Sequence, residues 1–237
     1  FGQKLAAMGF ALLLPALILM NMLFLEKNIA IDFAKKEIKG SEYLVPLKAF
    51  LSNTAQHRGL TNGYLSSGNK TDTTSILQVR KRILDDIKAI DSVEALYGSE
   101  LSTSQTWQSI KQQWTQLGGE SLKLSKKQSF TQHTSLINNV LSLFVQVGDS
   151  SNLILDPDLD SYYLMDMQVV RLPELMENLG KLRDYGAGLT GQSTLTQAQL
   201  IKLVVLKGKV VGFLSESIHD IDTAIAENGA LASVFTD

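Results

Sequence analysis

The sequence predicts an all-α protein, in which an N-terminal transmembrane helix continues into an elongated antiparallel bundle of about six helices. Three observations carry this prediction. The chain has only 4 prolines and 7% aromatic residues, and it shows no convincing run of strict period-2 alternation. An uncharged apolar run opens the chain. Beyond that run, turn-forming segments separate stretches with helical periodicity.

The apolar run covers residues 5–25 (LAAMGFALLLPALILMNMLFL), which are 21 residues without a charge. A helix needs about 20 such residues to cross the hydrocarbon core of a bilayer. A cleaved signal peptide is the alternative, but the run exceeds an h-region of ~7–15 residues and no A-x-A site follows it. We therefore expect residues 1–25 to form a transmembrane helix, in which neighbouring helices help to satisfy the carbonyl freed by Pro15.

The charges beside this run suggest its orientation. Lys4 precedes it, and Glu26 and Lys27 follow it. The positive-inside rule then places the N-terminus in the cytoplasm. We expect a bacterial inner-membrane protein with residues from about 26 onward in the periplasm. Because the first residue is Phe1 rather than Met and no second apolar span follows, the chain is expected to be a piece of a longer protein with a cytoplasmic output part.

Residues 26–237 are expected to form one helical-bundle domain. Segments rich in Gly, Ser, Thr and Asp, such as GNKTDTT at 68–74 and GSELSTS at 98–104, divide it into helical patterns. We expect helices at residues 26–67, 74–97, 104–126, 130–149, 157–187 and 195–235. Six helices return the last one towards the membrane.

The first helix of this domain carries a stripe with alternating spacings of three and four residues, as on the inward face of a bundle. Its members are Leu44, Leu47, Leu51, Thr54, Arg58, Thr61 and Leu65. Beside it, at intervals of seven, run Tyr43, Phe50, His57 and Tyr64. Arg58 therefore occupies a position where a leucine would be expected.

The fifth helix carries a matching stripe that also contains an arginine. It runs through Tyr162, Met165, Val169, Leu172, Met176, Leu179, Arg183 and Gly186. From the rise of ~1.5 Å per residue, Arg58 and Arg183 both lie ~12–15 Å below the membrane-distal tip, so they are expected at one level. Two converging guanidinium groups repel each other unless an anion lies between them.

This pairing predicts a site that binds a small anion such as nitrate or a small carboxylate, which a guanidinium fork contacts with two hydrogen bonds. The expected ligand-binding residues are Arg58 and Arg183, with their neighbours His57, Thr61, Thr54 and Tyr64. The alternative is that each arginine pairs with a local acid such as Asp184 or Glu120, or extends to solvent. That alternative predicts no cavity between the two.

Other classes of function find little support. The net charge of −2 does not favour nucleic acid, and the absence of cysteine excludes thiolate metal sites and cysteine nucleophiles. Residues 156–167 fail as a calcium loop because Ser161 and Met167 replace the required Gly and acid. The GAGLTG run at 186–191 ends a helical pattern instead of following a strand. We expect no enzyme, no catalytic residue, no metal and no cofactor.

Several motifs resemble a known family. The chain has QHRG at 56–59 late in its first periplasmic helix, NLILDPDLDSYYLMD at 152–166, and LRDYG at 182–186. An anchor followed by this layout resembles the periplasmic ligand-binding region of bacterial methyl-accepting chemotaxis proteins. A Q-x-R-G segment with a later arginine before a glycine-rich helix end is similar to the helical nitrate- and nitrite-sensing domain. The resemblance implies that Arg58 and Arg183 contact the anion.

One position departs from that pattern, because His57 stands where the sensing domain usually has Glu. The chain is also similar to the two-module helical domains of chemoreceptors that bind organic acids. We therefore expect the sensory domain of a homodimeric chemoreceptor, which transmits a helix displacement across the membrane for chemotaxis signalling. The same module could drive a histidine kinase or a diguanylate cyclase. A membrane-tethered bundle that binds a protein partner is the other alternative.

Overall fold

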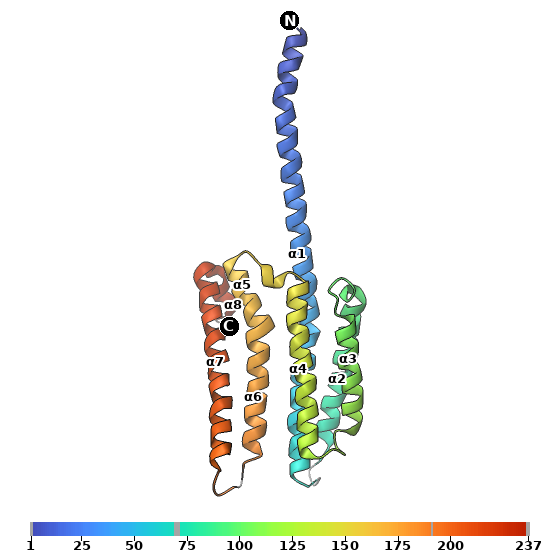
Figure 1. The fold of residues 1–237 in the computed structure, drawn as a ribbon, viewed down its shortest axis with the longest axis vertical. Coiled ribbons are helices and arrows are strands. Elements are labelled where there is room, and N and C mark those ends of the chain that lie inside the picture. The colour runs from blue at the N-terminus through green and yellow to red at the C-terminus, as the bar shows by residue number, and fades with distance from the viewer. Residues whose placement is uncertain (1, 69–71, 191, 236–237) are drawn as a thin grey trace.

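The structure, a computed structural model, describes residues 2–68, 72–190 and 192–235, and for residues 3–12 it describes the backbone alone. This part of the chain is predominantly helical and contains no strand, so the predicted all-α class is confirmed. The first helix, α1 (Gly2–Ser66), runs unbroken for 65 residues with Pro15 and Pro46 inside it. Its N-terminal half extends alone beyond the other helices (Figure 1).

The projecting part of α1 is apolar and exposed. From Leu13 to Leu25 its large aliphatic and aromatic side chains are more than half exposed. Among the described residues, α1 is the one helix long and apolar enough to cross a membrane. The predicted N-terminal apolar helix is therefore present, and it continues without interruption into the packed part of the fold.

The remaining helices lie side by side below this projection (Figure 1). They are α2 (Thr74–Tyr97), α3 (Ser104–Glu120), α4 (Lys126–Ser150), α5 (Leu159–Asp166), α6 (Leu172–Ala187) and α7 (Gln197–Glu227). Short helical turns η1 (Leu153–Leu155), η3 (Gly229–Leu231) and α8 (Ala232–Phe235) flank α5 and α7. A five-residue π-helix, η2 (Met167–Arg171), joins α5 to α6.

Helix α3 ends at Glu120, six residues before the expected end at residue 126, and two other differences from the expected boundaries have local causes. Helix α4 begins at Lys126, four residues early, because Ser125 and Gln128 form a reciprocal capping box. Thr196 and Gln199 start α7 in the same way. The last helix was expected to reach residue 235, but α7 ends at Glu227, where Asn228 takes an extended conformation and its side chain accepts a hydrogen bond from Ala230 N.

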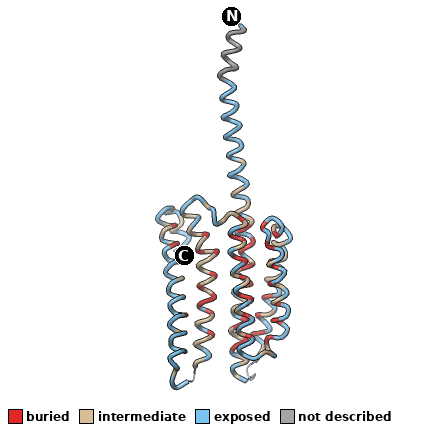
Figure 2. The backbone as a smooth tube through the Cα atoms, viewed as in Figure 1, coloured by how far each residue is buried: buried red, intermediate tan, exposed pale blue. Residues whose placement is uncertain are grey.

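Helices α1 to α4 share one apolar core, which Figure 2 shows as inward-facing buried stripes. The stripe predicted on α1 is confirmed from Leu44 to Thr61, and all six of these members are at most 1% exposed. Phe50 and Trp107 pack edge to face with ring centroids 5.6 Å apart. Leu143 and Phe144 bring α4 into the same core.

Helices α6 and α7 contribute no residue to that core. Helix α6 contacts α1 and α4, whereas α7 packs chiefly on α5, η2 and α6. The expected bundle of about six helices is thus divided into two parts (Figure 1). One is a four-helix part with a closed core, and the other is a hairpin of α6 and α7 that packs against it.

The stripe predicted on the fifth helix is wrong at Tyr162, which is 39% exposed, and again beyond η2. Leu179 is 47% exposed and the Arg183 side chain is 59% exposed. The buried residues of α6 include Pro173, Glu177, Gly180 and Asp184, each one position later than a predicted member of the stripe. A π-helical turn accommodates one extra residue, so every position that follows it is rotated by one residue on the helix surface.

Candidate functional site

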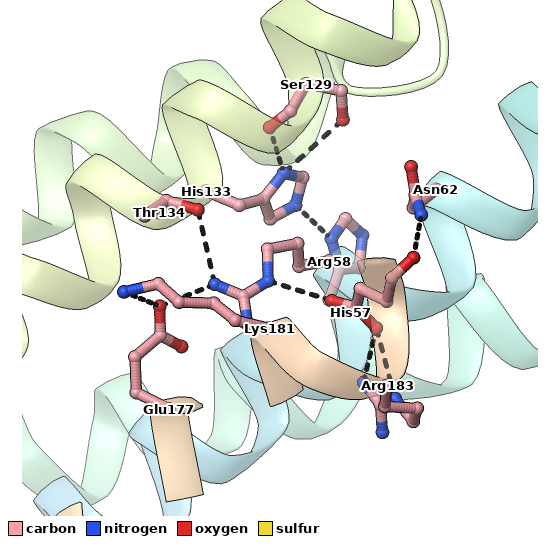
Figure 3. A network of polar contacts seen from close by, with 10 residues as sticks. His57, Arg58, Asn62, Ser129, His133, Thr134, Glu177, Lys181 and Arg183 are labelled. Atoms are coloured by element: carbon pink, nitrogen blue, oxygen red, sulfur yellow. Dashed lines mark hydrogen bonds and ion pairs between the residues drawn. The ribbon is translucent and has the colours of Figure 1, made fainter. Parts of the chain in front are cut away.

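Arg58 lies at the centre of a buried polar network between α1, α4 and α6, drawn in Figure 3. Its side chain is fully buried. Nη1 donates to Glu177 Oε1 at 2.8 Å and to Thr134 Oγ1 at 3.3 Å, and Nε donates to Asp184 Oδ2 at 3.0 Å. The guanidinium also lies 5.2 Å from the centroid of the Phe130 ring. A buried cation is tolerable here because two carboxylates compensate it.

Asp184 joins the two arginines that the sequence singled out. Arg58 binds Oδ2, while Arg183 Nε and Nη2 lie 3.1 and 3.0 Å from Oδ1. The arginines therefore lie at one level, as the helix rise predicts, and the anion between them is a side chain of the protein itself. This arrangement matches the structural alternative, in which carboxylates of the chain neutralise both arginines. An external anion at this point stays a prediction.

The other expected ligand-binding residues divide into two groups. His57, Thr54 and Thr61 are fully buried beside Arg58 on α1. The hydroxyls of Thr54 and Thr61 and the Nε2 of His57 have no hydrogen-bond partner among the described residues. Tyr64 is half-buried nearer the tip and makes no hydrogen bond to the network in the part of the chain that is described.

His57 and His133 form a buried pair with Nδ1 and Nε2 2.8 Å apart (Figure 3). His133 Nδ1 lies 2.7 Å from the carbonyl of Ser129, which can only accept, so this nitrogen carries the proton. His133 Nε2 must then accept from His57 Nδ1, and both rings are neutral. Desolvation, with the nearby Arg80 and Arg58 charges, lowers the pKa of His57 to about 3 and that of His133 to about 4.

A cavity of about 680 Å³ lies next to this network at the end of the fold away from the projecting part of α1. The N-terminal turns of α4 and α7 and the C-terminal turns of α6 surround it. Four lysines line it: Lys126, Lys127, Lys181 and Lys202. The other walls are largely apolar and include Phe130, Tyr185, Leu189 and Leu206.

The electrostatics of this lysine cavity, as we call it, favour an anion. Among the described residues, Lys126, Lys127 and Lys202 have no carboxylate within 4.0 Å, and Lys181 lies 3.0 Å from Glu177. Lys202 Nζ is 4.3 Å from the centroid of the Tyr185 ring. The one acid in the lining, Asp184, is already paired with Arg58 and Arg183. The cavity therefore holds an excess of positive charge.

Arg183 lies outside the lysine cavity. It borders a smaller cavity of about 360 Å³ between α1 and α6, together with Gln56, Gly59 and Asp184. A Cβ at Gly59 would lie 2.4 Å from Arg183 Nη2, so a larger residue there would displace the exposed Arg183 side chain. Arg58 lines neither cavity.

The four lysines of the cavity were not identified from the sequence. Lysine is common on helix surfaces, and these four come from three helices whose packing no local pattern specifies. Glu177 was not identified either, because the π-helix η2 rotates the residues that follow it by one position and turns Glu177 inward. Asp184 was anticipated as a pairing acid.

The comparisons with known proteins identify no relative. No family model, no curated protein and no solved structure matches the chain.

Proposed function

We propose that the chain is the extracytoplasmic sensory region of a transmembrane receptor and that it binds a small organic anion in the lysine cavity. The observation that carries this proposal is the convergence of four lysines from α4, α6 and α7 on one apolar-walled cavity whose one acid is neutralised internally. A carboxylate would pair with the lysines. The apolar body of the ligand would contact Phe130, Tyr185, Leu189 and Leu206.

The position of the cavity supports a signalling role. An anion held between Lys202 on α7 and Lys126 and Lys127 on α4 favours packings that bring α7 close to the four-helix part. Lys181 would turn from Glu177 towards the ligand, which changes the charge around Arg58. Helix α7 could then transmit a displacement along its axis. The apolar part of α1 would anchor the domain in a bacterial inner membrane, with the bundle in the periplasm.

The output of such a receptor lies outside this domain. Chemotaxis signalling is the output that the sequence motifs favour, and the same sensor could serve a histidine kinase or a diguanylate cyclase. A membrane-tethered bundle that binds a protein partner is a second candidate, because Arg58 and Arg183 are both neutralised within the chain.

The test is a thermal-shift screen of the full chain in detergent micelles against nitrate, acetate, succinate and benzoate. A ligand at about 100 times its dissociation constant stabilises the fold by ~2.7 kcal/mol. We expect a shift with an organic carboxylate that Lys202→Gln weakens at least ~10-fold in affinity, equivalent to ~1.4 kcal/mol. Lys209→Gln, an exposed lysine two turns further along α7, is the matched control and should leave affinity unchanged.

The Arg183→Gln variant distinguishes binding in the lysine cavity from binding beside Arg183. It should leave binding intact if the lysine cavity holds the ligand, and abolish it if the anion lies beside Arg183. No shift with any of the four compounds would contradict the proposal and favour the protein-binding candidate.

A further inference from the structure

Helix α7 has one side that packs against the rest of the protein and an opposite side that is apolar and exposed. On one side the buried residues Leu206, Ser217, Asp220 and Ala224 face α5, η2 and α6. On the other side, about 180° away at 100° per residue, Ile201, Val204, Val211 and Ile218 are 51–69% exposed. Their spacing of three and seven residues forms a seam of the kind found between paired helices. We call these four, with Gly208 and Ser215 between them, the outer seam.

The two glycines of α7 support a packed neighbour on this side. Gly208 and Gly212 lie four residues apart in the middle of the helix, and a Cβ at either would meet no atom within 4 Å. Glycine inside a helix destabilises it by about 0.5–1 kcal/mol relative to alanine. No neighbour among the described residues requires glycine at these two positions. Small residues spaced by four allow another helix backbone to approach closely.

The size of the exposed apolar surface suits a protein interface. Leu200, Val205 and Leu214, which flank the outer seam, are 47–52% exposed. Together these aliphatic side chains present on the order of 600 Å², at the upper end of apolar patches on monomers and near the ~800 Å² that each partner buries in a standard interface. The seam runs parallel to α1 (Figure 1), so it cannot lie flat on the membrane that α1 would enter.

We propose that the outer seam of α7 packs against the outer seam of a second copy of this chain, with the two helices parallel. This inference depends on the membrane anchoring in the proposed function, which holds two copies in the same orientation and at high local concentration.

The charges fit a parallel pair. In such a pair, a residue on one flank of the seam faces a residue on the opposite flank of the second copy. The facing residue lies five positions later in the sequence. Leu200 then faces Val205, Lys207 faces Gly212, and Leu214 faces His219. No flanking pair brings two like charges together, and the seam itself holds no charge between residues 201 and 218. Lys202, on the side towards the lysine cavity, stays free to bind the anion, so α7 lies between the ligand and the second copy.

Cysteine cross-linking tests this pairing, because the chain contains no cysteine of its own. Ser215→Cys places one thiol on the outer seam, where a parallel pair brings the two Cα atoms within the ~7 Å that a disulfide requires. Ser92→Cys is the matched control, since Ser92 is an exposed serine in the C-terminal part of α2. Each variant is reconstituted in lipid vesicles without ligand and oxidised with copper phenanthroline.

We expect Ser215→Cys to yield at least ~10-fold more covalent dimer than Ser92→Cys. Gly208→Leu added to Ser215→Cys should reduce that yield, because the leucine fills open space in the monomer but prevents close approach. Gly119→Leu, a change on α3 with equally open surroundings, should leave the yield of covalent dimer unchanged. Equal yields from the two serine positions would overturn the proposal, as would a yield that Gly208→Leu leaves unchanged.

The readout needs no anion, so a failure of ligand binding leaves this test intact. A chain that does not associate with the vesicles would contradict the anchoring, and sedimentation of the Gly208→Leu and unmodified chains in micelles would then decide whether the seam pairs without a membrane. A monomeric unmodified chain in that measurement would overturn the pairing.

Discussion

The four-helix part and the α6–α7 hairpin are held in place by different forces. Helices α1 to α4 enclose a continuous apolar core with two tryptophans, Trp107 and Trp114. The hairpin contributes nothing to that core and joins it through buried ion pairs, chiefly Arg58 with Glu177 and Asp184. A close-packed apolar core resists rearrangement, whereas the ion pairs that hold the hairpin change in strength when another charge binds nearby. The four-helix part is therefore a stable support, and the hairpin is a more adjustable element that carries the lysine cavity.

The largest expected effect comes from breaking the contact between the two parts. Arg58→Met leaves Glu177 and Asp184 buried without their central partner, and we expect a loss of about 3–5 kcal/mol in the free energy of unfolding. Arg183→Met is the matched control, because its pair with Asp184 is 59% exposed on the arginine side and should be worth less than ~1 kcal/mol. Urea denaturation of the full chain in micelles, followed by circular dichroism, measures both. Equal losses would show that the burial of Arg58 has no special role.

A pair of leucines compares the packing of the two parts directly. Leu143→Ala in α4 removes a side chain with no exposure from the closed core, and we expect a loss of about 2–5 kcal/mol. Leu200→Ala in α7 alters a side chain that is 48% exposed, so the loss should stay within ~0.5 kcal/mol. Tryptophan fluorescence reports the four-helix part, since Trp107 and Trp114 both lie in α3. A large effect of Leu200→Ala on the monomer would mean that the hairpin stabilises that part after all.

The histidine pair gives a smaller effect that depends on pH. The native state keeps His57 and His133 neutral, because their pKa values are lowered to about 3 and about 4. In the unfolded state both take up protons below about pH 6.5. Their contribution to stability is therefore complete above about pH 6.5 and is lost as the pH falls towards 4, by up to ~1.4 kcal/mol per pH unit for each histidine.

The double variant His57→Gln with His133→Gln should flatten this part of the stability profile between pH 6.5 and 4. His219→Gln is the control, because His219 is exposed on α7 and should leave the slope unchanged. An unchanged slope in the double variant would show that other groups, such as the carboxylates around Arg58, govern acid unfolding.

Much of the fold follows from local pattern. The apolar run of α1, the bounds of α2 and the buried stripe from Leu44 to Thr61 all appear where the residue spacing predicts them. Local periodicity succeeds there because the α-helix keeps one phase over its length. It fails beyond η2, which adds a residue to the turn and moves Glu177 and Asp184 inward in place of Met176 and Arg183.

The sequence by itself determined that this chain is helical, that it begins with a helix apolar enough to cross a membrane, and that Arg58 occupies a core position on α1. Only the tertiary structure decided which side chains Arg58 contacts and where the lysine side chains come together. Asp184 is 126 residues away from Arg58, and the four lysines of the cavity come from three helices. The physical reason is that helix formation depends on neighbours in sequence, while ion pairs and cavities depend on how complete helices pack.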